Sequence, residues 1–219
     1  RQAVAIDDTP QTRGYLLADL LRSPAAVGIM HGRSDTRYLR GIAVSPDGKT
    51  LAVADADAGL LLFDARTYAQ IGEPVEAPIT SNPEFVLTGV EAVAYSPDGE
   101  TLAFSGNGYI RLIDARTREQ LAEARIDAGA TRVAFTSDGS QLAVVESTAE
   151  RGSAWIAIRD ASTLRPVGSP IQPEGFRGLF ISQLWTDPSV ALTADGRSLV
   201  TTSVLGELAW WDLESREKT

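Results

Sequence analysis

A four-residue turn sequence that returns three more times constrains the fold of this chain more than any other feature. The four copies are Ser45–Gly48, Ser96–Gly99, Thr136–Gly139 and Thr193–Gly196, the first two reading Ser-Pro-Asp-Gly. A short apolar run precedes each copy and a second one follows it, such as 41–44 and 51–54. Proline presets φ at the second turn position, aspartate can bond the local backbone, and glycine takes positive φ. Each copy therefore predicts two strands joined by a tight turn.

A third apolar run follows each turn and ends in an aspartate. The four run-end aspartates are Asp64, Asp114, Asp160 and Asp212, which follow the turn aspartates by 17, 16, 22 and 17 residues. Successive turn aspartates are 51, 40 and 57 residues apart. A β-rich unit at roughly this period is typical of a propeller blade. We expect repeats at about 39–75, 90–126, 131–171 and 188–213, and we expect the run-end aspartates to cap the turns that follow them.

This unit resembles the repeat of the WD-repeat (WD40) β-propellers, and Trp211-Asp212 is the dipeptide itself. The resemblance covers about residues 26–219 and implies an all-β propeller of four-stranded antiparallel blades. It also implies a protein-binding scaffold. The family's Gly-His dipeptide is absent, because the only histidine is His31, which precedes Gly32. The Asp–His–Ser–Trp network of many such repeats therefore cannot form, and we expect the blades to rely on apolar packing.

Residues 1–24 differ from the rest and predict a helical lead-in to the propeller of residues 25–219. Thr12 to Arg22 has an apolar i, i+4 stripe, Asp8-Thr9-Pro10 suits a helix start, and Ser23-Pro24 suits its end. The helix could pack on the propeller or could end a preceding helical domain. In line with the latter alternative, residues 2–24 resemble the junction before the WD repeats of large bacterial STAND-type signalling ATPases and transcriptional regulators. No nucleotide-binding loop occurs in this sequence, so that resemblance places any ATPase outside it.

Four blades pose a closure problem. The outer strands we expect are 26–30, 69–75, 120–126 and 164–171, with none after Asp212. An open arc would leave two apolar blade faces in water. A longer parent chain could supply more blades, two copies could associate into an eight-bladed ring, or four blades could close alone. We favour a larger parent ring, with self-association of this piece through its open faces as a consequence.

Composition excludes several functions. The chain of 219 residues has 43% hydrophobic residues, no cysteine and a net charge of −9. Disulfides and thiol chemistry are therefore excluded, and a nucleic-acid partner is disfavoured because phosphate binding needs a basic face. No apolar run is long enough to span a bilayer, and no signal peptide is visible. We expect a cytoplasmic location and no membrane contact. Because the sequence begins at Arg1 and stops at Thr219, it reads as a piece of something longer.

Few residues suggest chemistry. His31 stands alone in a loop, and the repeated aspartates belong to the scaffold, since a catalytic group is normally a singular feature. The carboxylates of Asp55-Ala-Asp57-Ala-Gly59 lack the further ligands of a calcium loop. Glu146–Ser153 reads as a charged, solvated insertion in the third repeat. We therefore expect no catalytic residue, no metal and no cofactor.

Two long connections suggest a binding rim instead. Both join an outer strand to the next inner strand, and aromatic residues and arginine on such loops favour an interface hot spot. The residues predicted to bind protein are Phe85, Phe176, Arg177, Phe180 and Trp185. Equally, they could cover a blade edge. The sequence favours a noncatalytic sensor or interaction propeller in a bacterial signalling or transcription-regulatory protein. An exported or envelope-associated binding propeller is the alternative, and a propeller hydrolase comes after it.

Overall fold

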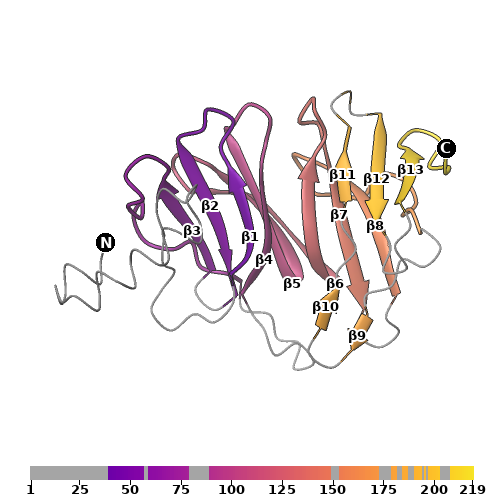
Figure 1. Ribbon diagram of the computed structural model, residues 1–219, viewed down its shortest axis with the longest axis horizontal. Coiled ribbons are helices and arrows are strands. Elements are labelled where there is room, and N and C mark those ends of the chain that lie inside the picture. The colour runs from indigo at the N-terminus through magenta and orange to yellow at the C-terminus, as the bar shows by residue number, and fades with distance from the viewer. Residues whose placement is uncertain are drawn as a thin grey trace, which may run out of the picture. The chain divides into compact units, whose positions relative to one another are not determined.

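The computed structural model describes thirteen strands and the turns between them (Figure 1). The described residues are 39–56, 59–78, 89–148, 153–172, 179–181, 184–186, 190–193, 195, 197–202 and 208–219. They all belong to one unit of the chain, residues 32–219. The lead-in helix and the outer strand expected at 26–30 lie outside the described residues. Within them the secondary structure is entirely β.

The first blade shows the basic pattern. Strands β1 (Leu39–Val44), β2 (Thr50–Asp55) and β3 (Gly59–Asp64) form an antiparallel sheet in chain order. An irregular outer segment at 69–75 then pairs with β3 through the bridges Leu60↔Val75 and Phe63↔Gln70. The expected four-strand unit is confirmed here. Its outer strand is interrupted because Gly72 has φ 65° and Pro74 lacks an amide hydrogen to donate.

The next sheet has five strands by hydrogen bonding and contains two blades. Its strands are β4 (Val90–Tyr95), β5 (Thr101–Asp114), β6 (Gln120–Phe135), β7 (Gln141–Thr148) and β8 (Ser153–Asp160). Within β5, residues 102–106 pair with β4 and residues 107–113 pair with β6. The amide of Ala115 also donates to the carbonyl of Glu100, as Ala65 does to Lys49 in the first blade. Strand β5 is thus a hairpin that turns at Gly106-Asn107-Gly108.

Strand β6 joins the second blade to the third. Its residues 120–129 pair with β5 as an outer strand, whereas residues 129–135 pair with β7 as the first inner strand of the third blade. The third blade continues through β7 and β8. Bridges Arg159↔Pro166 and Ile156↔Ile171 then add an irregular outer segment, as in the first blade. Strand β6 therefore supplies both the outer strand of the second blade and the first inner strand of the third blade.

The fourth blade consists of β11 (Val190–Leu192), β12 (Ser198–Thr202) and β13 (Leu208–Asp212). We expected no outer strand after Asp212, and this is wrong. Trp211 bridges to Lys218, and the amide of Thr219 donates to the carbonyl of Trp210 at 3.0 Å. The outer segment of the fourth blade therefore begins within this chain.

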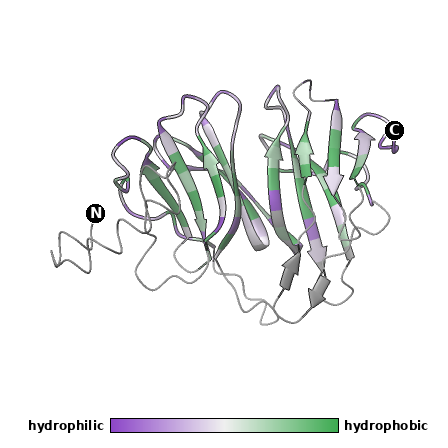
Figure 2. Ribbon diagram, in the orientation of Figure 1, coloured by the Kyte–Doolittle hydropathy of each residue, from purple (hydrophilic) through white to green (hydrophobic). Residues whose placement is uncertain are grey.

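Three apolar cores lie between consecutive blades. Alternate residues of each strand point to opposite faces, so Ala52 and Leu62 of the first blade meet Phe104 of the second. The second core joins Ile110 and Leu112 to the third blade, and the third core joins the third and fourth blades. Hydrophobic residues accordingly run along the middle of the strands (Figure 2). The expected reliance on packing between sheets agrees with these cores.

Candidate interaction surfaces

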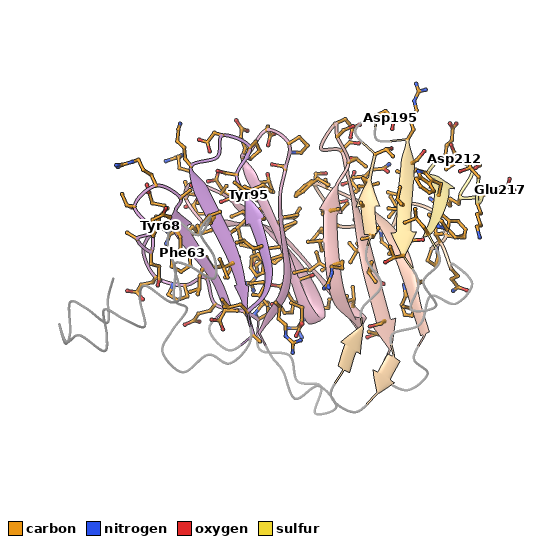
Figure 3. The ribbon with its side chains drawn as sticks, in the orientation of Figure 1. Phe63, Tyr68, Tyr95, Asp195, Asp212 and Glu217 are labelled. Carbon is orange, nitrogen blue, oxygen red and sulfur yellow. The ribbon has the colours of Figure 1, made fainter. Side chains whose placement is uncertain are left out.

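All eight repeated aspartates lie on turns at one end of the strands. The turn after the first strand and the turn after the third strand are adjacent, because Ala65 donates to Lys49 at 2.8 Å. The same contact recurs as Ala115 to Glu100, Ala161 to Ser140 and Leu213 to Arg197. Asp195 and Asp212 show this shared end in the fourth blade (Figure 3). We call this end the aspartate rim.

Hydrogen bonds explain why aspartate recurs there. The Oδ1 atom of Asp47 accepts from the Ser45 hydroxyl at 2.7 Å and from the Lys49 amide at 3.0 Å. The Oδ1 atom of Asp64 accepts from the Thr67 amide at 2.6 Å. Bonds of this kind favour the carboxylate, and they hold the pKa of Asp47 at about 2. The predicted capping role of the run-end aspartates is confirmed, and the rim aspartates serve local structure.

Strand direction places the other connections at the opposite end, which we call the hairpin rim. The long loop after the third blade enters it and contains β9 (Leu179–Ile181) and β10 (Leu184–Thr186). These strands pair so that Phe180 lies directly opposite Trp185. Two of the five predicted binding residues are thus brought together. The other three, Phe85, Phe176 and Arg177, lie outside the described residues.

An arginine clamp holds the first blade to the second, and our sequence reasoning missed it. Arg118 donates to the carbonyls of Ile71 at 2.7 Å and Glu73 at 3.2 Å. Gly72 lies between these carbonyls with φ 65°, and a Cβ there would collide with the Arg118 guanidinium. Only glycine fits this position without strain.

The same clamp recurs two blades later. Arg216 donates to the carbonyls of Val167 and Ser169, with Gly168 between them at φ 66°. Each arginine is the fourth residue after a run-end aspartate, and each glycine belongs to a Gly-x-Pro sequence. These spacings were visible in the sequence. They were missed because the signal appears only when alternate repeats are compared.

A buried ion pair corrects the interpretation of Glu146 as part of a solvated insertion. Glu146 is 5% exposed, and its Oε1 accepts from Arg159 Nε at 3.0 Å and Nη2 at 2.7 Å. Its Oε2 accepts from Trp155 Nε1 at 2.9 Å. Arg159 occupies a repeat position that is Phe63, Ile113 or Trp211 in the other blades. A buried charge at an apolar position needs a partner, and Glu146 on the neighbouring strand supplies it.

The described residues offer little for catalysis. They contain no group of three or more histidine, cysteine, aspartate or glutamate side chains that could hold a metal ion. Burial raises the pKa of Tyr95 to about 12, with the nearby Asp47 charge adding to it, so its hydroxyl is neutral at physiological pH. No helix in the described part of the chain is long and apolar enough to cross a membrane.

One hydrogen bond of the kind found in the Asp–His–Ser–Trp network of WD repeats is present in the fourth blade, where Trp211 Nε1 donates to Thr201 Oγ1 at 3.1 Å.

A model for the family described as WD domain, G-beta repeat, matches residues 82–114. No curated protein matches the sequence.

Solved structures resemble the whole arrangement of blades. A hydrazine synthase of Kuenenia stuttgartiensis is 20% identical with a TM-score of 0.64, over 89% of this chain and 51% of that one. A mitotic checkpoint complex chain is 21% identical with a TM-score of 0.63, over 85% and 52%. This chain thus spans about half the length of both. At such identity the two solved structures show the fold alone, which is a β-propeller. The family model adds that this propeller carries a WD40 repeat at residues 82–114.

Proposed function

We propose that this chain is a noncatalytic protein-binding scaffold whose partner contacts the hairpin rim. The observation that carries the proposal is the β9–β10 hairpin, which sets Phe180 opposite Trp185. Residues directly opposite each other in an antiparallel pair have Cα atoms about 5 Å apart. Aromatic side chains dominate the energetics of protein interfaces, so a pair of them on a rim loop favours a docking site.

The WD40 repeat supports a role in protein interaction. One of the similar structures is a chain of a multiprotein assembly, the mitotic checkpoint complex, although its likeness to this chain concerns the fold. We propose further that the parent is a cytoplasmic bacterial signalling or transcription-regulatory protein. Partner docking would then bias an equilibrium elsewhere in it, which requires different affinity for two states.

The test compares the wild-type chain with a Phe180→Ala, Trp185→Ala double variant as affinity baits, followed by titration of each captured protein in purified form. Leu121→Ala is the matched control, because Leu121 is 57% exposed on β6 and away from the hairpin. We expect a partner that binds wild type and control alike and binds the double variant at least roughly tenfold more weakly, as two hot-spot aromatics imply. Equal binding by all three would refute the hairpin site. Loss of cooperative unfolding in the double variant would show that the pair is core.

A further inference from the structure

The outer strand of the second blade differs from the outer segments of the blades on either side of it. Residues 120–129 of β6 form a continuous strand that pairs with β5 (Figure 1). The outer segments at 69–75 and 164–171 make only isolated bridges. Each contains a glycine at positive φ, Gly72 or Gly168, followed two residues later by proline. Both features interrupt the regular hydrogen-bonding edge of a strand.

Arginine side chains also bind these two irregular segments. Arg118 of the second blade donates to carbonyls of the first-blade segment, and Arg216 of the fourth blade donates to carbonyls of the third-blade segment. The third blade has Leu164 at this repeat position, and a leucine side chain cannot donate a hydrogen bond. The outer strand of the second blade is therefore both regular and without the clamp that its two neighbours receive.

One edge of the strand at 120–128 is open within the described part of the chain. In the five-stranded sheet this stretch pairs with β5 on one side, and β6 reaches β7 only from residue 129 onward. Alternate residues direct their backbone N–H and C=O groups away from β5. The side chains of Leu121, Arg125 and Asp127 are exposed along this stretch. An edge of this kind can pair with another strand.

The charged side chains along this edge select one pairing with a second copy of the same strand. Leu121, Glu123, Arg125 and Asp127 alternate along the chain and share one face. When a two-fold axis relates two identical antiparallel strands, the residue at the axis faces itself and its neighbours face one another. An axis at Ala124 sets Glu123 opposite Arg125, twice. An axis at Glu123 or at Arg125 instead sets two like charges opposite each other, which is destabilising.

The other face of the strand fits the same axis. Ala122, Ala124 and Ile126 are partly buried against the core between the second and third blades. An axis at Ala124 sets Ala122 opposite Ile126 and the two copies of Ala124 opposite each other, so apolar side chains meet apolar ones. An axis at Ile126 would also oppose unlike charges, but it overlaps residues 124–128 only. The axis at Ala124 engages the whole stretch 120–128.

We propose that the outer edge of the second blade pairs with the same edge of a second copy of this chain, antiparallel about a two-fold axis at Ala124. Such a contact is isologous, so it closes at two copies. It joins two blades into one continuous sheet, in which main-chain hydrogen bonds supply affinity and the opposed charges fix the register. The pairing uses no residue of the β9–β10 hairpin, so it is independent of the partner proposed there.

Single-cysteine variants test the register directly, because the chain has no cysteine of its own. In the proposed pair the two Cα atoms at position 124 face each other about 4.5–5.5 Å apart, which a disulfide can bridge. The two Cα atoms at position 122 are four residues out of register, roughly 13 Å apart, which is too far. We expect mild oxidation to convert Ala124→Cys into a covalent dimer. The matched control Ala122→Cys, on the same face and also partly buried, should stay uncrosslinked.

Sedimentation equilibrium of the 219-residue chain measures the affinity with charge variants. We expect wild type to be dimeric. Arg125→Glu sets two pairs of like charges across the junction, so its Kd should rise by roughly tenfold or more. Arg116→Glu makes the same change at an exposed arginine of the aspartate rim and should leave the Kd unchanged. Far-UV circular dichroism verifies that each variant is folded.

Four outcomes would overturn the proposal. A monomeric wild type would do so, and it would leave the edge to an extended peptide of another protein. Failure of Ala124→Cys to cross-link would exclude this register. Equal cross-linking of both cysteine variants would mean collision or association through another surface. Equal weakening by both charge variants would mean a general effect of net charge. None of these measurements involves Phe180 or Trp185, so a failure here leaves the hairpin site untouched.

Discussion

Removing one side chain of the buried Glu146–Arg159 pair should destabilise this protein more than any surface change. The side chains are 7% and 9% exposed. Glu146→Ala deletes two bonds to Arg159 and one to Trp155, and leaves the guanidinium with the Leu164 carbonyl, 2.9 Å from Nη1. Breaking a buried pair in this way costs about 3–5 kcal/mol, because a charge stays behind without its counterion.

The pair should nevertheless add little net stability over an apolar replacement. The side chains of Glu146 and Arg159 lie on the same face of the β7–β8 pair. On that face of β8 only the small Ala157 separates Arg159 from Trp155. Glu146→Leu with Arg159→Met roughly retains the volume and removes both desolvation penalties. We expect this double variant to lie within about 2 kcal/mol of wild type, since the half-buried Trp155 nitrogen can turn to water.

Urea unfolding followed by far-UV circular dichroism measures these differences in the free energy of unfolding. Tryptophan fluorescence is avoided because it would also respond to the local change at Trp155. Glu123→Ala is the matched control, because Glu123 pairs with Arg111 at 2.6 Å with side chains 22% and 17% exposed. Breaking that more solvated pair should lower the free energy of unfolding by only about 1 kcal/mol. Equal losses for Glu146→Ala and Glu123→Ala would refute the argument from burial. A double variant as unstable as Glu146→Ala would refute the argument from desolvation.

Two further predictions concern the repeated turns. Gly72→Ala should lower the free energy of unfolding by about 2 kcal/mol, and by about 1 kcal/mol in an Arg118→Ala background, where only backbone strain remains. Gly48→Ala is the control for strain alone, because Gly48 has φ +71° and no atom lies within 4 Å of the place that an added Cβ would take. Hydrogen bonds lower the pKa of Asp47 and Asp138 to about 2, so the stability they add is present above about pH 4 and is lost as pH falls toward 2. The difference in Tm between wild type and Asp138→Asn should therefore shrink over that range, and a constant difference down to about pH 2 would contradict the assignment.

The elements that could be predicted from sequence are those set by local chemistry. The Ser-Pro-Asp-Gly turn needs a glycine at positive φ, and Gly48 and Gly99 have φ 71° and 76°. Strand alternation identifies the faces that pack between blades. Such features depend on residues close in the chain, and therefore every repeat displays them separately.

The features that sequence reasoning missed depend on distant pairs. Arg118 contacts Ile71 across 47 residues, in the preceding repeat. Glu146 and Arg159 belong to one repeat, but their side chains meet only because β7 and β8 pair in a particular register. Phe180 and Trp185 pair across β9 and β10. The binding role predicted for them and for Phe85, Phe176 and Arg177 stays a prediction.

The clamps indicate that the repeating unit of this chain is a pair of blades. Asp64 and Asp160 precede the Gly-x-Pro segments and are 96 residues apart, whereas Asp114 and Asp212 precede the clamp arginines and are 98 residues apart. A clamp requires both the arginine and the Gly-x-Pro segment of the preceding blade. Substituting either one therefore removes the hydrogen bonds that the other makes across the junction. The apolar junction between pairs has no such requirement, because any surface of matching shape can replace it. The junctions within a pair are therefore specific and directional, whereas the junction between the second and third blades relies on apolar packing around Ile110, Leu112 and Leu164.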